Sequence, residues 1–298
     1  MTLRCLRLLR LMIDERRAPA KLARRPEPEA MDEGASVEAF HAQGQPGGVL
    51  FPLYHFNALA LSRLLPEGGT LLDLGSGSGQ FLAHMARLRP DIRVVGLELS
   101  PRMAKLGRDY LCHEGLSERV TLQVGDMTNF RRCISVRPHA ISSIFSLHHL
   151  PNENDLRCVL DEIAASGRDR ACSVWIFDHV RPRVASSADA FPEIFSPSAA
   201  EVFRNASRDS LLASFSFEWL SQALDETGMG EFRHSITGVL PMYQTHCLNR
   251  RLTPPESSLE ADVPVSAADR LSALMFAVLL RVRFLQARDW QEKSGNRG

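Results

Sequence analysis

The sequence predicts an α/β fold, with a doubly wound, mostly parallel sheet that carries helices on both faces. Three observations predict it. Short apolar runs alternate with helix-like segments between residues 70 and 180, and parallel strands need such helical crossovers. One of the runs leads directly into a glycine-rich loop. The chain has 298 residues, which suffices for one large domain or two smaller ones.

Residues 1–48 are expected to form a mobile N-terminal arm with some helical character. Arginines stand among leucines in MTLRCLRLLRLMI, and Pro19, Pro26, Pro28 and Pro46 interrupt the charged stretch that follows. The leucine-rich start also suits a transit peptide or a helix on a membrane surface. Apolar residues recur densely over 50–65, which predicts a helix that ends at Pro66.

Five strands and three helices are expected next. Apolar and β-branched runs predict the strands at 70–74, 92–97, 120–124, 141–145 and 172–177. Helical spacing predicts the helices at 81–88, 100–112 and 152–165. Ser100 followed by Pro101 is typical of a helix start, because serine caps free amides and proline fits the first turn.

The alternation of strands and helices breaks after residue 181. Residues 181–216 are rich in Ala, Ser and Pro and are expected to form a lid or insert over the site. A helix is expected at 217–227. Two strand-like runs at 232–239 and 242–248 then predict an antiparallel pair at one edge of the sheet.

Residues 49–250 are therefore expected to form the main domain, and 251–298 a linker followed by a C-terminal amphipathic helix. That helix is expected over 267–290. Its apolar stripe consists of Leu271, Leu274, Met275, Val278, Val282 and Leu285. The stripe is expected to pack on the domain itself, and dimerisation or contact with a membrane surface are the alternatives.

Composition narrows the classes of protein to consider. Lys+Arg and Asp+Glu number 35 each, so nucleic acid is not expected as the main partner, because phosphate contacts need a basic surplus. The six cysteines include no CxxC pair, and no metal site is predicted. No stretch is apolar for long enough to predict a transmembrane helix. A reducing, cytoplasmic location is expected.

The strongest motif is TLLDLGSGSG at residues 70–79, in which a buried strand enters a glycine-rich turn before a helix. Such a turn lets a ligand approach the backbone and the free amides of the helix. A dinucleotide or S-adenosylmethionine are the candidate ligands. The glycines at 75, 77 and 79 follow GxGxG rather than GxGxxG, because residue 80 is Gln. This disfavours a dinucleotide-dependent oxidoreductase, and the chain also lacks a P-loop pattern.

The motif resembles the first strand and turn of class I S-adenosylmethionine-dependent methyltransferases, which commonly read hhDhGxGxG, where h is hydrophobic. Three further strand ends match in order: Glu98 in VVGLELSPRM, Asp126 in GDM, and the FSLHHLP stretch at 145–151. The last resembles the HHLP sequence of many small-molecule members. The resemblance covers residues 50–180, more loosely to 250, and implies a Rossmann-like, seven-stranded sheet with S-adenosylmethionine as cofactor.

The resemblance also implies which residues bind this cofactor. Glu98 would accept hydrogen bonds from both ribose hydroxyls, Asp126 would accept one from the adenine amine, and Met127 would pack against the ring. The expected cofactor-binding residues are Asp73, Gly75, Ser76, Gly77, Gly79, Glu98, Leu99, Asp126, Met127 and Ser146.

His148, His149 and Asp178 are the expected catalytic residues, and Tyr54 and His179 lie near the expected site. Imidazole titrates near neutral pH, which suits removal of a proton from a hydroxyl or phenol acceptor. Two structural roles compete with this interpretation. One histidine could cap the next helix or bind backbone, and Asp178 could instead pair with Arg181.

The end of the fourth strand also bears on the acceptor. It carries neither the [DNS]PP[YFW] sequence of enzymes that methylate exocyclic base amines nor a Pro-Cys nucleophile. We expect methyl transfer to an oxygen or nitrogen of a small molecule, which the phenylalanines of the lid suggest is partly hydrophobic. A peptide or protein methyltransferase, and a non-catalytic module that binds S-adenosylmethionine, are the alternatives. A homodimer through the C-terminal helix is a possible assembly.

Overall fold

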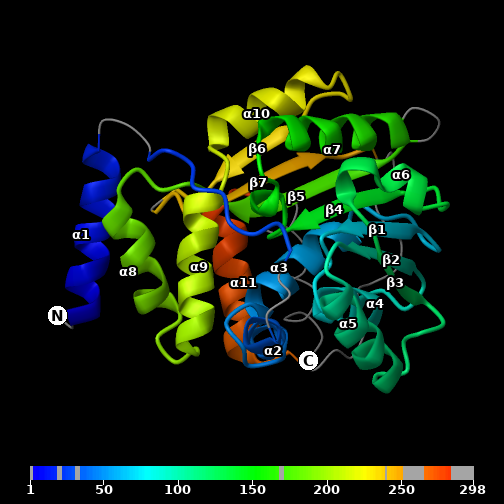
Figure 1. Cartoon of the computed structure of the whole chain (residues 1–298), viewed down its shortest axis with the longest axis horizontal. Helices are drawn as coiled ribbons and strands as arrows, with labels where there is room; N and C mark the ends of the chain where they lie inside the picture. The colour runs from blue at the N-terminus through cyan, green and yellow to red at the C-terminus, as the bar shows by residue number, and fades with distance from the viewer. Residues whose placement is uncertain are drawn as a thin grey trace, which may run out of the picture.

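The computed structural model of the chain describes residues 3–18, 22–30, 34–167, 171–238, 240–250 and 265–282 (Figure 1). Within these residues, seven strands form one sheet in the order β3-β2-β1-β4-β5-β7-β6. The strands are β1 (Thr70–Leu74), β2 (Arg93–Glu98), β3 (Val120–Val124), β4 (Ala140–Ile144), β5 (Ser173–His179), β6 (Arg233–Ile236) and β7 (Tyr243–Leu248). The first five are parallel, and β7 is antiparallel to both β5 and β6. The predicted α/β fold with an antiparallel edge is confirmed.

The chain reverses its direction of travel across the sheet beside β1. That strand pairs with β2 on one side and with β4 on the other, so its loop lies between two outward-running series of strands. Ligands of such sheets bind outside the carboxyl ends of the strands at this point of reversal. The predicted glycine loop at residues 75–79 follows β1 there.

Helices cover both faces of the sheet and pack against two separate apolar clusters (Figure 1). One face carries α3 (Phe51–Ser62), α4 (Gln80–Leu88), α5 (Pro101–His113) and α11 (Ala267–Leu279). The other carries α6 (Phe130–Cys133), α7 (Glu153–Ser166) and α10 (Phe217–Glu226). Ser100 caps α5 as predicted, because its hydroxyl accepts the amide of Met103.

The expected N-terminal arm is helical in two places. Residues 3–17 form α1 (Leu3–Arg17), residues 34–44 form α2 (Gly34–Gly44), and both pack on the rest of the chain. Buried Glu15 accepts the amides of Arg183 and Val184, at the start of α8 (Ala185–Phe195). A carboxylate there satisfies amides that have no partner within the helix. Specific contacts therefore connect the arm to the rest of the chain, and its mobility stays a prediction.

The expected lid consists of α8 and α9 (Glu201–Ala213). Together with α1 these helices pack around an apolar cluster that includes Leu11, Phe191 and Leu211. Helix α9 also contacts η2 (Leu147–His149), the short helix that follows β4. The lid residues thus lie beside the predicted catalytic histidines.

The C-terminal helix is shorter than predicted. It ends at Leu279, because the next turn passes through Arg281, whose φ of 53° lies in the left-handed region. Residues 283–298, including Leu285 and Trp290, lie outside the described residues. The predicted stripe is wrong in part, since the buried face carries Ala273 and Ala277, whereas Leu271, Met275 and Val278 are exposed. Dimerisation through this helix stays a prediction.

No helix within the described ranges combines the length and the apolar character that crossing a bilayer requires.

Candidate functional site

The glycine loop after β1 closely approaches the end of β4. Gly75 has a φ of +73°, and a Cβ atom there would lie 2.3 Å from the Cβ of Ser146. Any side chain at this position would be strained and would clash, which explains the glycine. The Ser146 hydroxyl donates to the main-chain oxygen of Leu74 at 2.7 Å and so ties the two strand ends together.

Glu98 connects the same loop to the end of β2. One carboxylate oxygen accepts the amide of Gly77 at 2.7 Å, and the other accepts the amide of Ser100 at 2.9 Å. Gly77 also has a positive φ, of 56°, which aims its amide at the carboxylate. Glu98 is therefore held in a fixed orientation at the carboxyl end of its strand.

A pocket opens between these strand ends. Seven of the ten predicted cofactor-binding residues line it: Gly75, Gly77, Glu98, Leu99, Asp126, Met127 and Ser146. Asp126 accepts both the amide and the hydroxyl of Thr128, each at 2.7 Å, which fixes its carboxylate. Phe40, Met103, Phe145 and Leu150 add apolar surface. The pocket thus combines two oriented carboxylates with apolar walls.

The other three predicted residues lie outside the lining and support the loop. Asp73 is buried and accepts the hydroxyl of Ser142 at 2.6 Å. Burial raises the pKa of Asp73 to about 7. The Ser76 hydroxyl donates to the main-chain oxygen of Asp73, and Gly79 precedes the first turn of α4.

The predicted catalytic residues His148 and Asp178 form a buried pair. His148 Nδ1 lies 2.6 Å from Asp178 Oδ1, and the His148 amide donates to Asp178 Oδ2 at 3.1 Å. The amide of His179 donates to Asp178 as well, at 2.7 Å. Among the described residues, Asp178 thus pairs with His148, and the ion pair with Arg181 that the sequence left open does not form.

This pairing shifts the pKa values of both groups. Burial alone would lower the pKa of His148, but the carboxylates of Asp178 and Glu27 hold it above its usual value. Burial alone would raise the pKa of Asp178, but His148 holds it below its usual value. Burial lowers the pKa of His149 to about 3, so this ring is neutral.

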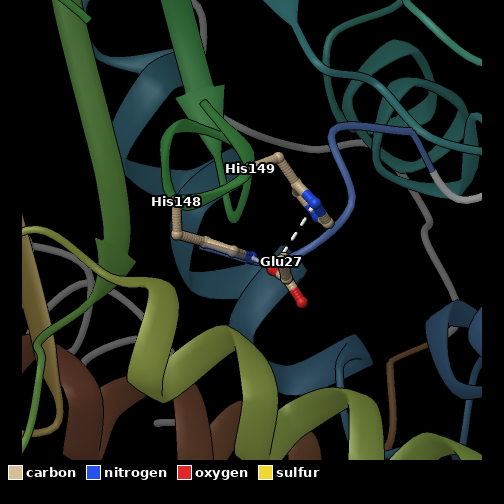
Figure 2. A group of neighbouring side chains, drawn as sticks. All are labelled: Glu27, His148 and His149. Atoms are coloured by element: carbon tan, nitrogen blue, oxygen red, sulfur yellow. Dashed lines mark ion pairs between the residues drawn. The ribbon is translucent and has the colours of Figure 1, made fainter. Parts of the chain in front are cut away.

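Glu27 completes the arrangement from the other end of the chain. Its Oε1 atom lies 3.3 Å from His148 Nε2 and 3.4 Å from His149 Nδ1. Figure 2 shows both imidazole rings pointing toward this carboxylate, which reaches them from the segment of residues 22–30. Burial raises the pKa of Glu27, despite the opposing effect of His148.

Arg24 fastens the 22–30 segment to the loop that carries the histidines. Its guanidinium donates to the main-chain oxygens of His148, Leu150 and Pro151, and to that of Ala213 at the end of α9. It also lies 4.1 Å from the centre of the Phe215 ring. The segment is thereby fixed across the carboxyl ends of β4 and β5.

The region from β1 to the end of α7 matches a known domain. Residues 71–169 match the family model described as a methyltransferase domain. Residues 71–169 thus form a methyltransferase domain. The match agrees with the family that the strand-end motifs predicted.

Curated relatives share only part of this chain. Ribosomal RNA small subunit methyltransferase G of Frankia alni is 34% identical over 76 residues, which are 26% of this chain and 29% of that protein. Ajmaline N-methyltransferase of Rauvolfia serpentina is 27% identical over 120 residues, which are 39% of this chain and 38% of that protein. The chain thus spans about a third of the length of these two relatives.

The fold extends over more of the chain than the sequence similarity does. The crystal structure of a SAM-dependent methyltransferase from Aquifex aeolicus aligns with a TM-score of 0.50 and 14% identity. The alignment covers 73% of this chain and 98% of the other. With so few identical residues, the superposition shows a shared fold alone.

The sequence alone did not indicate the N-terminal part of the candidate site. Arg24 and Glu27 stand in a proline-rich stretch without a motif, and Glu29 and Phe40 line the pocket from the same part of the chain. Their role depends on where the chain runs, so no local pattern reveals it. Tyr54, considered in the sequence, is buried and lies outside the pocket lining.

Proposed function

We propose that the chain transfers a methyl group from S-adenosylmethionine to an oxygen or nitrogen atom of a small, partly hydrophobic molecule. The observation that carries the proposal is the buried His148–Asp178 pair, in which His148 follows β4 and Asp178 lies near the end of β5, beside the pocket between the strand ends. A base held next to a site for a methyl donor is what a protonated acceptor requires.

The pocket residues suit this donor. Glu98, held by the Gly77 amide, would accept from the ribose hydroxyls, and Asp126 from the adenine amine, with Met127 against the ring. Gly75 lies so close to Ser146 that a Cβ atom there would clash, so only a glycine keeps the backbone of the loop open to a ligand. When bound, S-adenosylmethionine supplies a methyl group on a sulfonium, whose departure as a neutral thioether needs little acid assistance.

His148 would take the acceptor's proton at Nε2. Asp178 holds the other ring nitrogen, which sets the tautomer and stabilises the positive charge that the ring gains. His149 is the nearer of the two histidines to the donor, since it lines the pocket. Alignment of donor and acceptor supplies much of the remaining rate enhancement.

The acceptor's character follows from the lid. Helices α8 and α9 bring buried Phe191 and Phe203 to this end of the molecule, and Phe191 packs against His179. A formal net charge of zero gives no general attraction for a polyanion. A small molecule with an apolar part would suit an apolar lid better than nucleic acid would.

The test is transfer of label from methyl-labelled S-adenosylmethionine into an extract, followed by separation of protein from small molecules. We expect label in the small-molecule fraction, and its loss in the His148→Gln variant. The matched control, His234→Gln, changes a histidine remote from the pocket and should transfer normally. Label in protein would favour a peptide or protein acceptor, and donor binding without transfer in any fraction would favour a non-catalytic module.

A further inference from the structure

Three side chains at the end of β4 point at one small space. They are Glu27 of the 22–30 segment and the neighbouring histidines His148 and His149 (Figure 2). The side chains are 10%, 3% and 23% exposed, respectively. Oε1 of Glu27 is buried and has no hydrogen-bond partner among the described residues. Its contacts with His148 Nε2 and His149 Nδ1, at 3.3 and 3.4 Å, lack hydrogen-bond geometry, so this buried oxygen can still take a ligand.

Two of the three spacings between the ligand atoms match those of a tetrahedral metal site. Zinc bonds to histidine nitrogen and carboxylate oxygen are about 2.0–2.1 Å long, which places neighbouring ligand atoms about 3.3–3.4 Å apart. Glu27 Oε1 lies 3.3 Å from His148 Nε2 and 3.4 Å from His149 Nδ1. All three atoms lie within 4.8 Å of one another.

The surroundings of His148 have the form of a second coordination shell. Asp178 holds its Nδ1 at 2.6 Å, and the amides of His148 and His179 fix this carboxylate in turn. Such a carboxylate–histidine pair orients Nε2 and raises its basicity toward a metal. Asp178 and Glu27 together also supply two negative charges, which balance a divalent cation.

From this geometry we infer that Glu27, His148 and His149 bind one zinc ion, with the fourth position left to water or another ligand. Two nitrogens and one oxygen suit zinc, whereas magnesium prefers oxygen ligands. One contact has to be exchanged. His149 Nδ1 also lies 3.2 Å from the main-chain oxygen of Pro28, and a nitrogen that donates a proton there has no lone pair for the metal.

Zinc at this position would fasten the N-terminal segment to the catalytic loop. Glu27 lies 121 positions before His148, so the ion would join distant parts of the chain beside the contacts of Arg24. The ion would occupy Nε2 of His148, the atom that the proposed function uses as base. Zinc binding and proton acceptance at that atom therefore exclude each other, but the metal site itself does not rest on the proposed function.

The test is metal binding by the full-length chain, without methyl donor or acceptor. The protein is dialysed against a chelator and titrated with Zn²⁺ by calorimetry, and with Co²⁺ as an absorbing probe of tetrahedral coordination. We expect one ion per chain and no heat with Mg²⁺. Glu27→Gln and His149→Gln should each weaken zinc binding at least tenfold. His234→Gln, which alters the separate Asp225–His234–His246 cluster, should not.

A second readout separates loss of a ligand from loss of fold. S-adenosylhomocysteine should still bind Glu27→Gln, because Glu27 is outside the pocket lining. Amide exchange in residues 22–30 should slow when zinc is added to the wild type but not to this variant. Absence of zinc binding by the wild type, binding by Glu27→Gln and His149→Gln as tight as that of the wild type, or loss of binding in His234→Gln alone would each overturn the site.

Discussion

The guanidinium of Arg24 donates a hydrogen bond of 2.9 Å to the main-chain oxygen of His148, which lies 124 positions later in the chain. The same side chain reaches the carbonyl oxygens of Leu150 and Pro151. Three carbonyls of the loop at residues 148–151 thus depend on one residue of the N-terminal segment. The segment belongs to the site, and the loop is not positioned by the sheet alone.

Replacing Arg24 with Ala should release the N-terminal segment. One hydrogen bond to a charged group is worth about 1.5–3 kcal/mol, and several buried carbonyls lose their donor together. We expect the free energy of unfolding in urea to fall by at least that amount and the amides of residues 22–30 to exchange faster. The neighbouring exposed Arg25 offers a matched control. If Arg25→Ala has the same effect, the Arg24 contacts do not hold the segment.

Gly75→Ala should disrupt the close approach between the loop after β1 and the end of β4. The added Cβ would lie 2.3 Å from that of Ser146, in a backbone conformation with a φ of +73°. We expect a loss of stability above about 2 kcal/mol, typical of overpacking combined with strain, and no measurable binding of S-adenosylhomocysteine.

Gly68→Ala is the control that separates backbone strain from the steric clash expected in Gly75→Ala. Gly68 has a φ of +63°, but an added Cβ meets nothing within 4 Å. The cost should stay near 1 kcal/mol, with ligand binding retained. Equal losses in the two variants would show that the close approach of the loop to Ser146 is unimportant.

Asp73 should make folding less favourable as the pH rises. Burial raises its pKa from 3.8 to about 7, so the folded state holds a proton that the unfolded state has already released. The contribution of Asp73 to the free energy of unfolding is close to zero below pH 3.8. It becomes unfavourable between pH 3.8 and about pH 7, and is constant above that range. A shift of about three units corresponds to roughly 4 kcal/mol.

Asp73→Asn removes this titration while keeping an oxygen for the hydroxyl of Ser142. Relative to the wild type, the variant should gain stability in urea unfolding at pH 7.5 and gain little at pH 4. A stability difference that is the same at both pH values would contradict the buried, titrating carboxylate.

Asp178→Asn should slow methyl transfer without weakening donor binding. The amide cannot stabilise the charged imidazole, so kcat should fall by about 100-fold or more, with the affinity for S-adenosylhomocysteine unchanged. Asp225→Asn is the control, because Asp225 pairs with His234 outside the pocket lining. If kcat is unchanged in Asp178→Asn, the pair formed by His148 and Asp178 has only a structural role.

Sequence reasoning succeeded where short-range patterns determine the structure. The glycines after β1 and the acid after β2 belong to contiguous motifs, and parallel strands bring their carboxyl ends together, so Gly77 and Glu98 could be expected to meet. Ser100 was correctly predicted as a helix cap from its local sequence in the same way.

It failed where a contact depends on the path of the chain. Arg24 and Glu27 stand among prolines, and only the packing of α1 and α2 brings them to His148. The end of α11 was missed for a related reason, since the residue with positive φ is Arg281 and not the glycine that usually marks such an end. Asp73 belongs to the motif that predicts cofactor binding, but it lies outside the pocket lining and bonds to Ser142 instead.

The most direct test of the account is calorimetric binding of S-adenosylhomocysteine to the folded wild type, to Glu98→Ala and to the exposed control Glu118→Ala. We expect saturable binding by the wild type and the control, and at least about tenfold weaker binding by Glu98→Ala, because one charge-assisted hydrogen bond is worth that much. No binding by the wild type, or equal binding by all three, would contradict it.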